Sequence, residues 1–141
     1  MIIVDTNVIS ELMKTSPSIT VIDWLNRRDA TQLYITTITI AEIAYCLNAL
    51  PNGNKRQALE NNFNNAIQDA FKNRILQFTE PAAHVYGKIM ANRKELGRPM
   101  SVLDGQIAAI TLIHKAGLAT RNINDFLHCG IDLHNPFDDT V

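Results

Sequence analysis

The sequence has few cysteines, no long apolar run and no marked excess of either charge. Cys46 and Cys129 are far apart and form no Cys-x-x-Cys pair, so we expect neither a disulfide scaffold nor a thiolate metal cluster, and we expect Cys46 to be a small buried residue. The apolar run at residues 107–113 is much shorter than the roughly 18 residues that a membrane span needs. The start of the chain lacks the basic lead of a signal peptide. These absences predict a protein of the reducing cytoplasm.

Size and composition fit one globular domain over residues 1–141. Hydrophobic residues make up 46 % of the chain and charged residues 19 %. Thirteen basic and fourteen acidic residues give a formal net charge of -1, which neither requires nor excludes a nucleic-acid partner. The distribution of charge therefore matters more than its sum, because several acids gathered at one site would leave the remaining surface biased towards positive charge.

The first ten residues combine a buried strand with a carboxylate. Residues 2–4 are β-branched and apolar, a pattern typical of a central parallel strand. Asp5 ends this strand, and a helical spacing of apolar residues follows. In parallel α/β sheets, ligands bind where the strands end, so Asp5 is a candidate metal ligand. An aspartate is also a good helix N-cap, and the position suits both roles.

Strand-like and helix-like patterns alternate along the rest of the chain, which predicts an α/β fold: three layers, α/β/α, around a mainly parallel sheet of about four to five short strands. Helices are predicted after Ser18, from Thr39, over about residues 55–71, from Glu80 to about Gly97, and through residues 107–113, the last being apolar nearly all round and therefore buried. Further strands are predicted at residues 33–36, 74–78, 117–120 and 130–133.

Four acids follow predicted strands or lie in first helical turns, where the strand ends of a parallel sheet would bring them together. They are Asp5, Glu42, Asp104 and Asp125. Glu42 has another explanation, since Thr39-Ile-Ala-Glu42 is a capping box in which the glutamate only reaches back to an amide. Carboxylates gathered in one crevice repel one another and require a cation. Oxygen ligands favour Mg²⁺ or Mn²⁺ over zinc, and His128, Cys129 and His134 match no usual zinc spacing.

Basic residues lie close to these acids in the sequence. Arg93, Lys94 and Arg98 come just before Asp104, and Arg121 follows the last buried strand. They are candidates to bind the phosphate backbone of RNA, although a solvated helix end beside a turn is the commoner explanation for each of the first three.

Short motifs spread over almost the whole chain resemble those of PIN-domain ribonucleases, and most closely the VapC toxins and their FitB-like branch. The motifs are Val4-Asp-Thr-Asn-Val8, Thr39-Ile-Ala-Glu42, Leu103-Asp104, Thr120-Arg-Asn-Ile-Asn-Asp-Phe126, Gly97-Arg-Pro99, Asn135-Pro136 and the extension of the first motif to Glu11. The resemblance implies a Mg²⁺- or Mn²⁺-dependent endoribonuclease toxin that cuts single-stranded RNA. It also implies a homodimer, a small antitoxin whose C-terminal segment enters a groove near the acids, and operator DNA bound through the antitoxin complex.

The resemblance also assigns residues. Three acids form the site and two hydroxyl residues support it: Asp5, Glu42, Asp104, Thr6 and Thr120. Family members often carry a fourth acid directly after Thr-Arg, where this chain has Asn122. Asp125 is the candidate substitute, and Asn122 is then a supporting residue.

Two other functions are compatible with parts of the pattern. A PIN-like binding module would dimerise and dock a partner without cutting RNA, but it would not need all three core acids. A phosphatase with an aspartate nucleophile would be expected to carry a second aspartate two residues after the first. This chain has Asn7 there.

Overall fold

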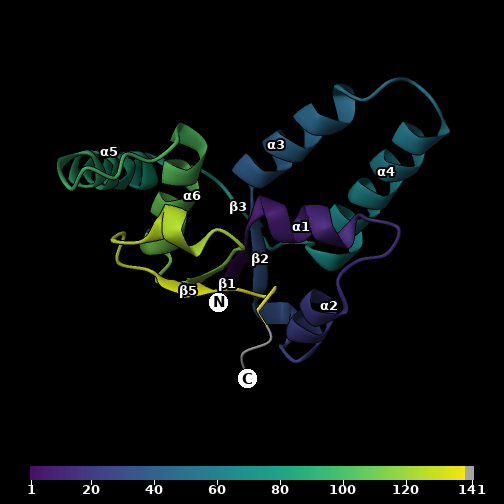
Figure 1. Cartoon of the computed structure of the whole chain (residues 1–141), viewed down its shortest axis with the longest axis horizontal. Helices are drawn as coiled ribbons and strands as arrows, with labels where there is room; N and C mark the ends of the chain where they lie inside the picture. The colour runs from purple at the N-terminus through teal and green to yellow at the C-terminus, as the bar shows by residue number, and fades with distance from the viewer. Residues whose placement is uncertain (139–141) are drawn as a thin grey trace.

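The fold is built on a five-stranded parallel sheet, as predicted (Figure 1). A computed structural model describes residues 1–138 of the chain. The strand order is β3-β2-β1-β4-β5, so the first strand of the sequence is the middle strand of the sheet. The strands are β1 (Ile2–Val4), β2 (Leu33–Thr36), β3 (Ile75–Leu76), β4 (Gly117–Ala119) and β5 (Asp132–His134).

Helices cover both faces of this sheet. The helices are α1 (Thr6–Leu12), α2 (Ile19–Asn26), α3 (Thr37–Asn48), α4 (Asn54–Asn65), α5 (Glu80–Glu95) and α6 (Val102–Ile113), with 3-10 turns at Ala30–Gln32 and Ile123–Phe126 and a π-helical turn at Ala66–Ala70. Successive side chains of a strand point to opposite faces. Accordingly, Ile3 packs in one apolar cluster with α5 and α6, whereas Val4 packs in a second cluster with α1, α2, α3 and α4. The predicted α/β/α layering is confirmed. No helix within residues 1–138 is both long and apolar enough to span a membrane.

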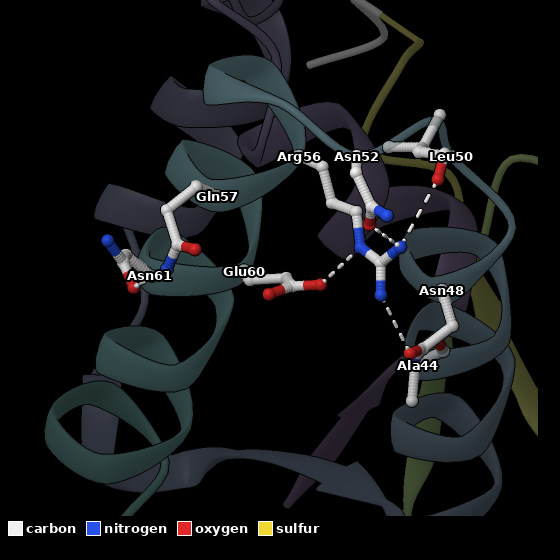
Figure 2. A network of polar contacts seen from close by, with 8 residues as sticks. All are labelled: Ala44, Asn48, Leu50, Asn52, Arg56, Gln57, Glu60 and Asn61. Carbon is white, nitrogen blue, oxygen red and sulfur yellow. Dashed lines mark hydrogen bonds and ion pairs between the residues drawn. The ribbon is translucent and has the colours of Figure 1, made fainter.

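The helices α3 and α4 form a hairpin that extends from the rest of the molecule (Figure 1). Figure 2 shows the network that fixes its turn: the Arg56 guanidinium pairs with Glu60 at 2.7 Å and donates to the Leu50 carbonyl oxygen. It also donates to the side-chain oxygens of Asn48 and Asn52, at 3.0 and 2.8 Å. These bonds link the end of α3 to the first turns of α4, so one arginine bridges the two helices of the hairpin.

An apolar groove of about 340 Å³ lies between this hairpin and α1. Met13, Ile43, Leu47 and Leu59 contribute to its lining. Cys46 also lines the groove and is exposed, so the prediction of a buried Cys46 is wrong. The reason is helical phase: the buried stripe of α3 contains Ile43 and Leu47, and Cys46 lies off it.

The start of α3 also differs from the prediction. The helix begins at Thr37, and the hydroxyl of Thr36 caps it by accepting from the Thr39 amide at 3.1 Å. Thr39 is therefore inside the first turn, and the prediction that Thr39 and Glu42 form a capping box is wrong. Glu42 lies a full turn into the helix, where its carboxylate is free to point at another part of the chain.

The remaining boundaries follow the prediction closely. The helix α5 begins at Glu80, and Gly97 follows its end with φ of +74°, a conformation that glycine adopts without strain. The helix α6 is buried over residues 107–111, as expected from its composition. The predicted strand at residues 74–78 is shorter, consisting of Ile75 and Leu76.

Candidate functional site

Three carboxylates from distant parts of the sequence line one pocket of about 430 Å³. Asp5 follows the central strand β1, Glu42 projects from α3, and Asp104 lies in the first turn of α6. The lining consists of Asp5, Thr6, Asn7, Ser10, Glu11, Lys14, Glu42, Asp104, Arg121 and Asn122. The predicted convergence of these acids at the strand ends is thus what the structure shows for three of the four.

Asp5 is the most buried of the three, with 4 % of its surface exposed. Its Oδ1 accepts from the Thr6 amide at 2.8 Å and caps α1, and its Oδ2 accepts from the Thr120 hydroxyl at 2.7 Å. The pKa of Asp5 is raised to about 6, first by burial and then by the charges of Asp104 and Glu42, against the hydrogen bonds from Thr120 and Thr6. Asp5 therefore both caps α1 and lines the acid pocket.

Burial also raises the pKa values of the other two acids. For Glu42, the hydrogen bond from the Thr6 hydroxyl, 2.9 Å from Oε1, opposes this rise and the charge of Asp104 adds to it. For Asp104, a hydrogen bond with Ser101 opposes the rise in pKa, and the charge of Asp125 adds to it. Mutual repulsion of this kind is what a bound cation would relieve.

A divalent cation fits the chemistry of this donor set. All the candidate ligands are oxygens, which suits Mg²⁺ or Mn²⁺. Within residues 1–138, no three acid, histidine or cysteine side chains come close enough to enclose an ion by themselves. Mg²⁺ does not need such an enclosure, because it keeps several waters and binds one or two carboxylates directly. Asp5, Glu42 and Asp104 are the residues that would hold it.

The predicted supporting residues lie against these acids. Thr6 donates to Glu42 and is 3.0 Å from the Thr39 hydroxyl, and Thr120 donates to Asp5. Asn122 lines the pocket, and its backbone amide donates to the Thr120 hydroxyl at 3.1 Å. These hydrogen bonds orient the carboxylates in the way that supporting groups orient metal ligands.

Asp125 is not part of the pocket lining. It lies exposed in the 3-10 turn Ile123–Phe126, near enough to Asp104 to raise the pKa of that carboxyl. Just before this turn, Arg121 and Asn122 line the pocket.

Arg93 is buried, so the prediction that it binds RNA is wrong. It is 4 % exposed, and its guanidinium donates to the carbonyl oxygens of Arg98, Asp125 and Leu127 at 2.6 to 2.8 Å. These carbonyls belong to loops whose approach to α5 cannot be seen in the sequence. Lys94 and Arg98 are exposed, and only Arg121 of the four predicted cations lines the pocket.

One face of α1 lines the pocket and was not predicted. Asn7, Ser10, Glu11 and Lys14 all line the pocket. Their spacing of three and four residues places them on one side of a helix, and this polar stripe beginning directly after Asp5 was the available signal.

Comparison with known proteins assigns the family. The family model described as PIN domain matches residues 2–129. The VapC ribonuclease Y4jK of Sinorhizobium fredii is 36 % identical over 138 residues, covering 98 % of this chain and 99 % of that protein. Toxin FitB of Neisseria gonorrhoeae is 35 % identical over 139 residues, covering 99 % of this chain and 100 % of that protein.

Solved structures agree with this. The structure of FitAB bound to an IR36 DNA fragment contains a chain that superposes with a TM-score of 0.93 at 34 % identity, covering 100 % of this chain and 99 % of that one. The family model and these full-length similarities show that the chain belongs to the PIN-domain family, among the relatives of the VapC and FitB toxins.

Proposed function

We propose that this protein is a Mg²⁺- or Mn²⁺-dependent endoribonuclease that cleaves single-stranded regions of RNA, and that it is the toxin of a toxin–antitoxin pair. The observation that carries the proposal is the convergence of Asp5, Glu42 and Asp104 on one pocket, with the pKa of Asp5 raised to about 6 chiefly by burial. Buried carboxylates placed together at a cost in electrostatic energy are typical of functional sites. Similarity to a VapC ribonuclease supports the choice of RNA as substrate.

The residues of the chain have distinct parts in this reaction. A divalent cation supplies an activated water and stabilises negative charge on the phosphoryl group that is attacked. Thr120 and the Thr6 amide hold the two oxygens of Asp5, and the Thr6 hydroxyl holds Glu42. The carboxylates are thus oriented before metal or substrate binds, which lowers the reorganisation needed during the reaction.

Partner proteins form the second part of the proposal. We infer a homodimer in the cytoplasm, neutralised by a small antitoxin of the kind found with FitB or VapC, and operator DNA bound only through that complex. A solved relative, FitAB, is bound to DNA. The apolar groove between α1 and the α3–α4 hairpin shares Ser10 and Lys14 with the acid pocket, so a peptide lying in the groove would end at the acids.

The test is cleavage by protein purified free of any partner. Single-stranded RNA should be cut in Mn²⁺ or Mg²⁺ and left intact in EDTA, and Asp5→Asn should cut at least about 100-fold more slowly. Asp23→Asn, which changes an exposed aspartate of α2 outside the pocket, is the matched control and should cut normally. Equal cleavage by the native protein and Asp5→Asn would show that the activity does not come from the acid pocket and would refute the proposal.

One observation favours a second function, a PIN-like binding module that does not cut RNA. Asn122 occupies the pocket where family members often carry a fourth acid. If the absence of a fourth acid abolishes catalysis, the protein should still bind Mn²⁺ and its antitoxin while leaving RNA intact. Asn122→Asp would then create the cleavage activity that the native chain lacks.

A further inference from the structure

Glu11 is a buried carboxylate of the pocket that the proposed reaction does not use. Its side chain is 7 % exposed. Oε1 lies 2.9 Å from Lys14 Nζ, and Oε2 accepts from the Ser18 backbone amide at 3.1 Å. The bonds from Lys14 and then Ser18 hold the pKa of Glu11 below its usual range. Glu11 is therefore an ionised group with both oxygens engaged, whereas the pKa values of the acids that would bind metal are raised.

Arg121 is held near the same carboxylate. Its Nη2 lies 3.8 Å from Glu11 Oε1, and its guanidinium lies 3.8 Å above the ring of Phe137. Its backbone amide donates to Asn7 Oδ1 at 3.2 Å. A long side chain held by an aromatic ring and an anion has fewer conformations to lose when a ligand binds.

Both cations remain accessible while their shared anion is buried. The side chains of Lys14 and Arg121 are 60 % and 53 % exposed. In the part of the chain that the structure describes, they are the two basic residues that line the acid pocket. Because Lys14 and Arg121 stay more than half exposed while they contact Glu11, a ligand at the pocket can reach both of them.

We propose that Glu11 is a positioning residue and that Lys14 and Arg121, which it holds at the rim of the acid pocket, bind a phosphate of the RNA backbone next to the one that is cleaved. The inference rests on the proposed function, because it concerns the same substrate. An RNA strand entering a pocket with three carboxylates is repelled by them. Two cations beside the pocket offset that repulsion and fix the position of the strand without reading its sequence.

Binding without cleavage tests the two cations. A short fluorescently labelled single-stranded RNA is titrated in EDTA, and its anisotropy is followed at several salt concentrations. Lys14→Gln and Arg121→Gln should each weaken binding several-fold and reduce the slope of log K against log salt by about 0.7. Lys72→Gln, at an exposed lysine outside the pocket, is the matched control and should change neither quantity.

Glu11→Gln distinguishes positioning from simple electrostatics. The substitution makes the protein more positive by one charge, and long-range attraction alone would therefore tighten RNA binding. Loss of positioning predicts the opposite, a several-fold weaker binding and a raised KM with kcat changed less than about twofold. Glutamine can still accept from the Ser18 amide. Tighter binding, or a fall in kcat and Tm with unchanged KM, would show that Glu11 has no positioning role.

The outcomes separate this inference from the proposed nuclease function. If the native protein cuts RNA but Lys14→Gln and Arg121→Gln bind it as tightly as the native protein does, the cation site is refuted and the nuclease remains. If the native protein binds RNA through these cations but does not cut it, the nuclease is refuted and the cation site remains. Absence of RNA binding by the native protein would overturn the inference.

Discussion

Asp5 and Arg93 are equally buried charged residues in two regions of the molecule. Arg93 is surrounded by hydrogen-bond acceptors, whereas Asp5 lies near other negative charges. Each is 4 % exposed. The Arg93 guanidinium donates to three backbone carbonyls and joins the loops at residues 98 and 125–127 to α5. Asp5 accepts two close hydrogen bonds, but it also faces the negative charges of Asp104 and Glu42, which raise its pKa beyond the effect of burial.

The difference distinguishes a structural charge from a functional one. Buried charges are tolerated when hydrogen bonds replace the lost water, as they do around Arg93. A buried charge among like charges lowers stability until a ligand neutralises it. Removing the charge of Arg93 should therefore destabilise the protein, whereas removing the charge of Asp5 should stabilise the metal-free protein.

The largest expected change in stability follows substitution of Arg93. Arg93→Met keeps much of the apolar stem but leaves three carbonyls without their donor, so the free energy of unfolding should fall by about 3–5 kcal/mol. Chemical denaturation measures this. Lys94→Met, at the exposed neighbouring residue, should change stability by less than about 0.5 kcal/mol. Equal effects of the two substitutions would mean that the Arg93 contacts contribute nothing specific.

The next effect is the response to metal. A ligand that binds only the folded protein, at 100 times its Kd, stabilises it by about 2.7 kcal/mol, so Mn²⁺ or Mg²⁺ should raise Tm. Asp104→Ala should remove most of that rise, and it should also stabilise the metal-free protein because a repulsive charge is lost. A loss of about 1 kcal/mol with an unchanged metal response would instead assign Asp104 to helix stabilisation.

The third effect is the pH dependence of the metal-free protein. The pKa of Asp5 is about 6 in the folded protein and 3.8 ordinarily. Well below pH 3.8 Asp5 is protonated in both states and has no effect. As pH rises from about 4 to above 6 the unfolded chain ionises more readily, so stability falls by about 2 kcal/mol.

Asp5→Asn should remove this contribution and still cap α1, because asparagine caps helices as well as aspartate does. Denaturation in EDTA at pH 4.5 and pH 8 measures both effects. Asp23→Asn provides the control for a general change in charge. If Asp5→Asn is no more stable than the native protein at pH 8, Asp5 carries no electrostatic strain.

The smallest effect is at Asn122. Asn122→Asp adds a carboxylate to the lining of the pocket, which should tighten Mn²⁺ binding and lower the stability of the metal-free protein by less than about 1 kcal/mol. Calorimetric titration of Mn²⁺ measures the first change. Asn124→Asp, at an exposed residue of the same segment, is the control. Unchanged affinity in Asn122→Asp would place the bound metal away from this side of the pocket.

Local patterns predicted the parts of the fold that local physics controls. Three β-branched or apolar residues ahead of Asp5 predicted the central strand, and alternating elements predicted parallel pairing. Because parallel strands end at the same edge, Asp5, Glu42 and Asp104 could be assigned to one site before any distance was known, although the same argument also included Asp125, which does not line the pocket. The capping box at Thr39 failed because Thr36, three residues earlier, caps the helix instead.

The sequence by itself determined the α/β layering and indicated three of the acids that line the pocket, since strand burial, helix periodicity and placement after strands are all properties of short segments. Only the tertiary structure decided how each charge is neutralised. Arg93 was expected to bind phosphate and instead binds loop carbonyls, and Glu11 contacts Lys14, Ser18 and Arg121. Such partners are brought together by loops that are distant in the sequence. A buried charge without a partner lowers the stability of the fold, so the partners of each charge decide its role.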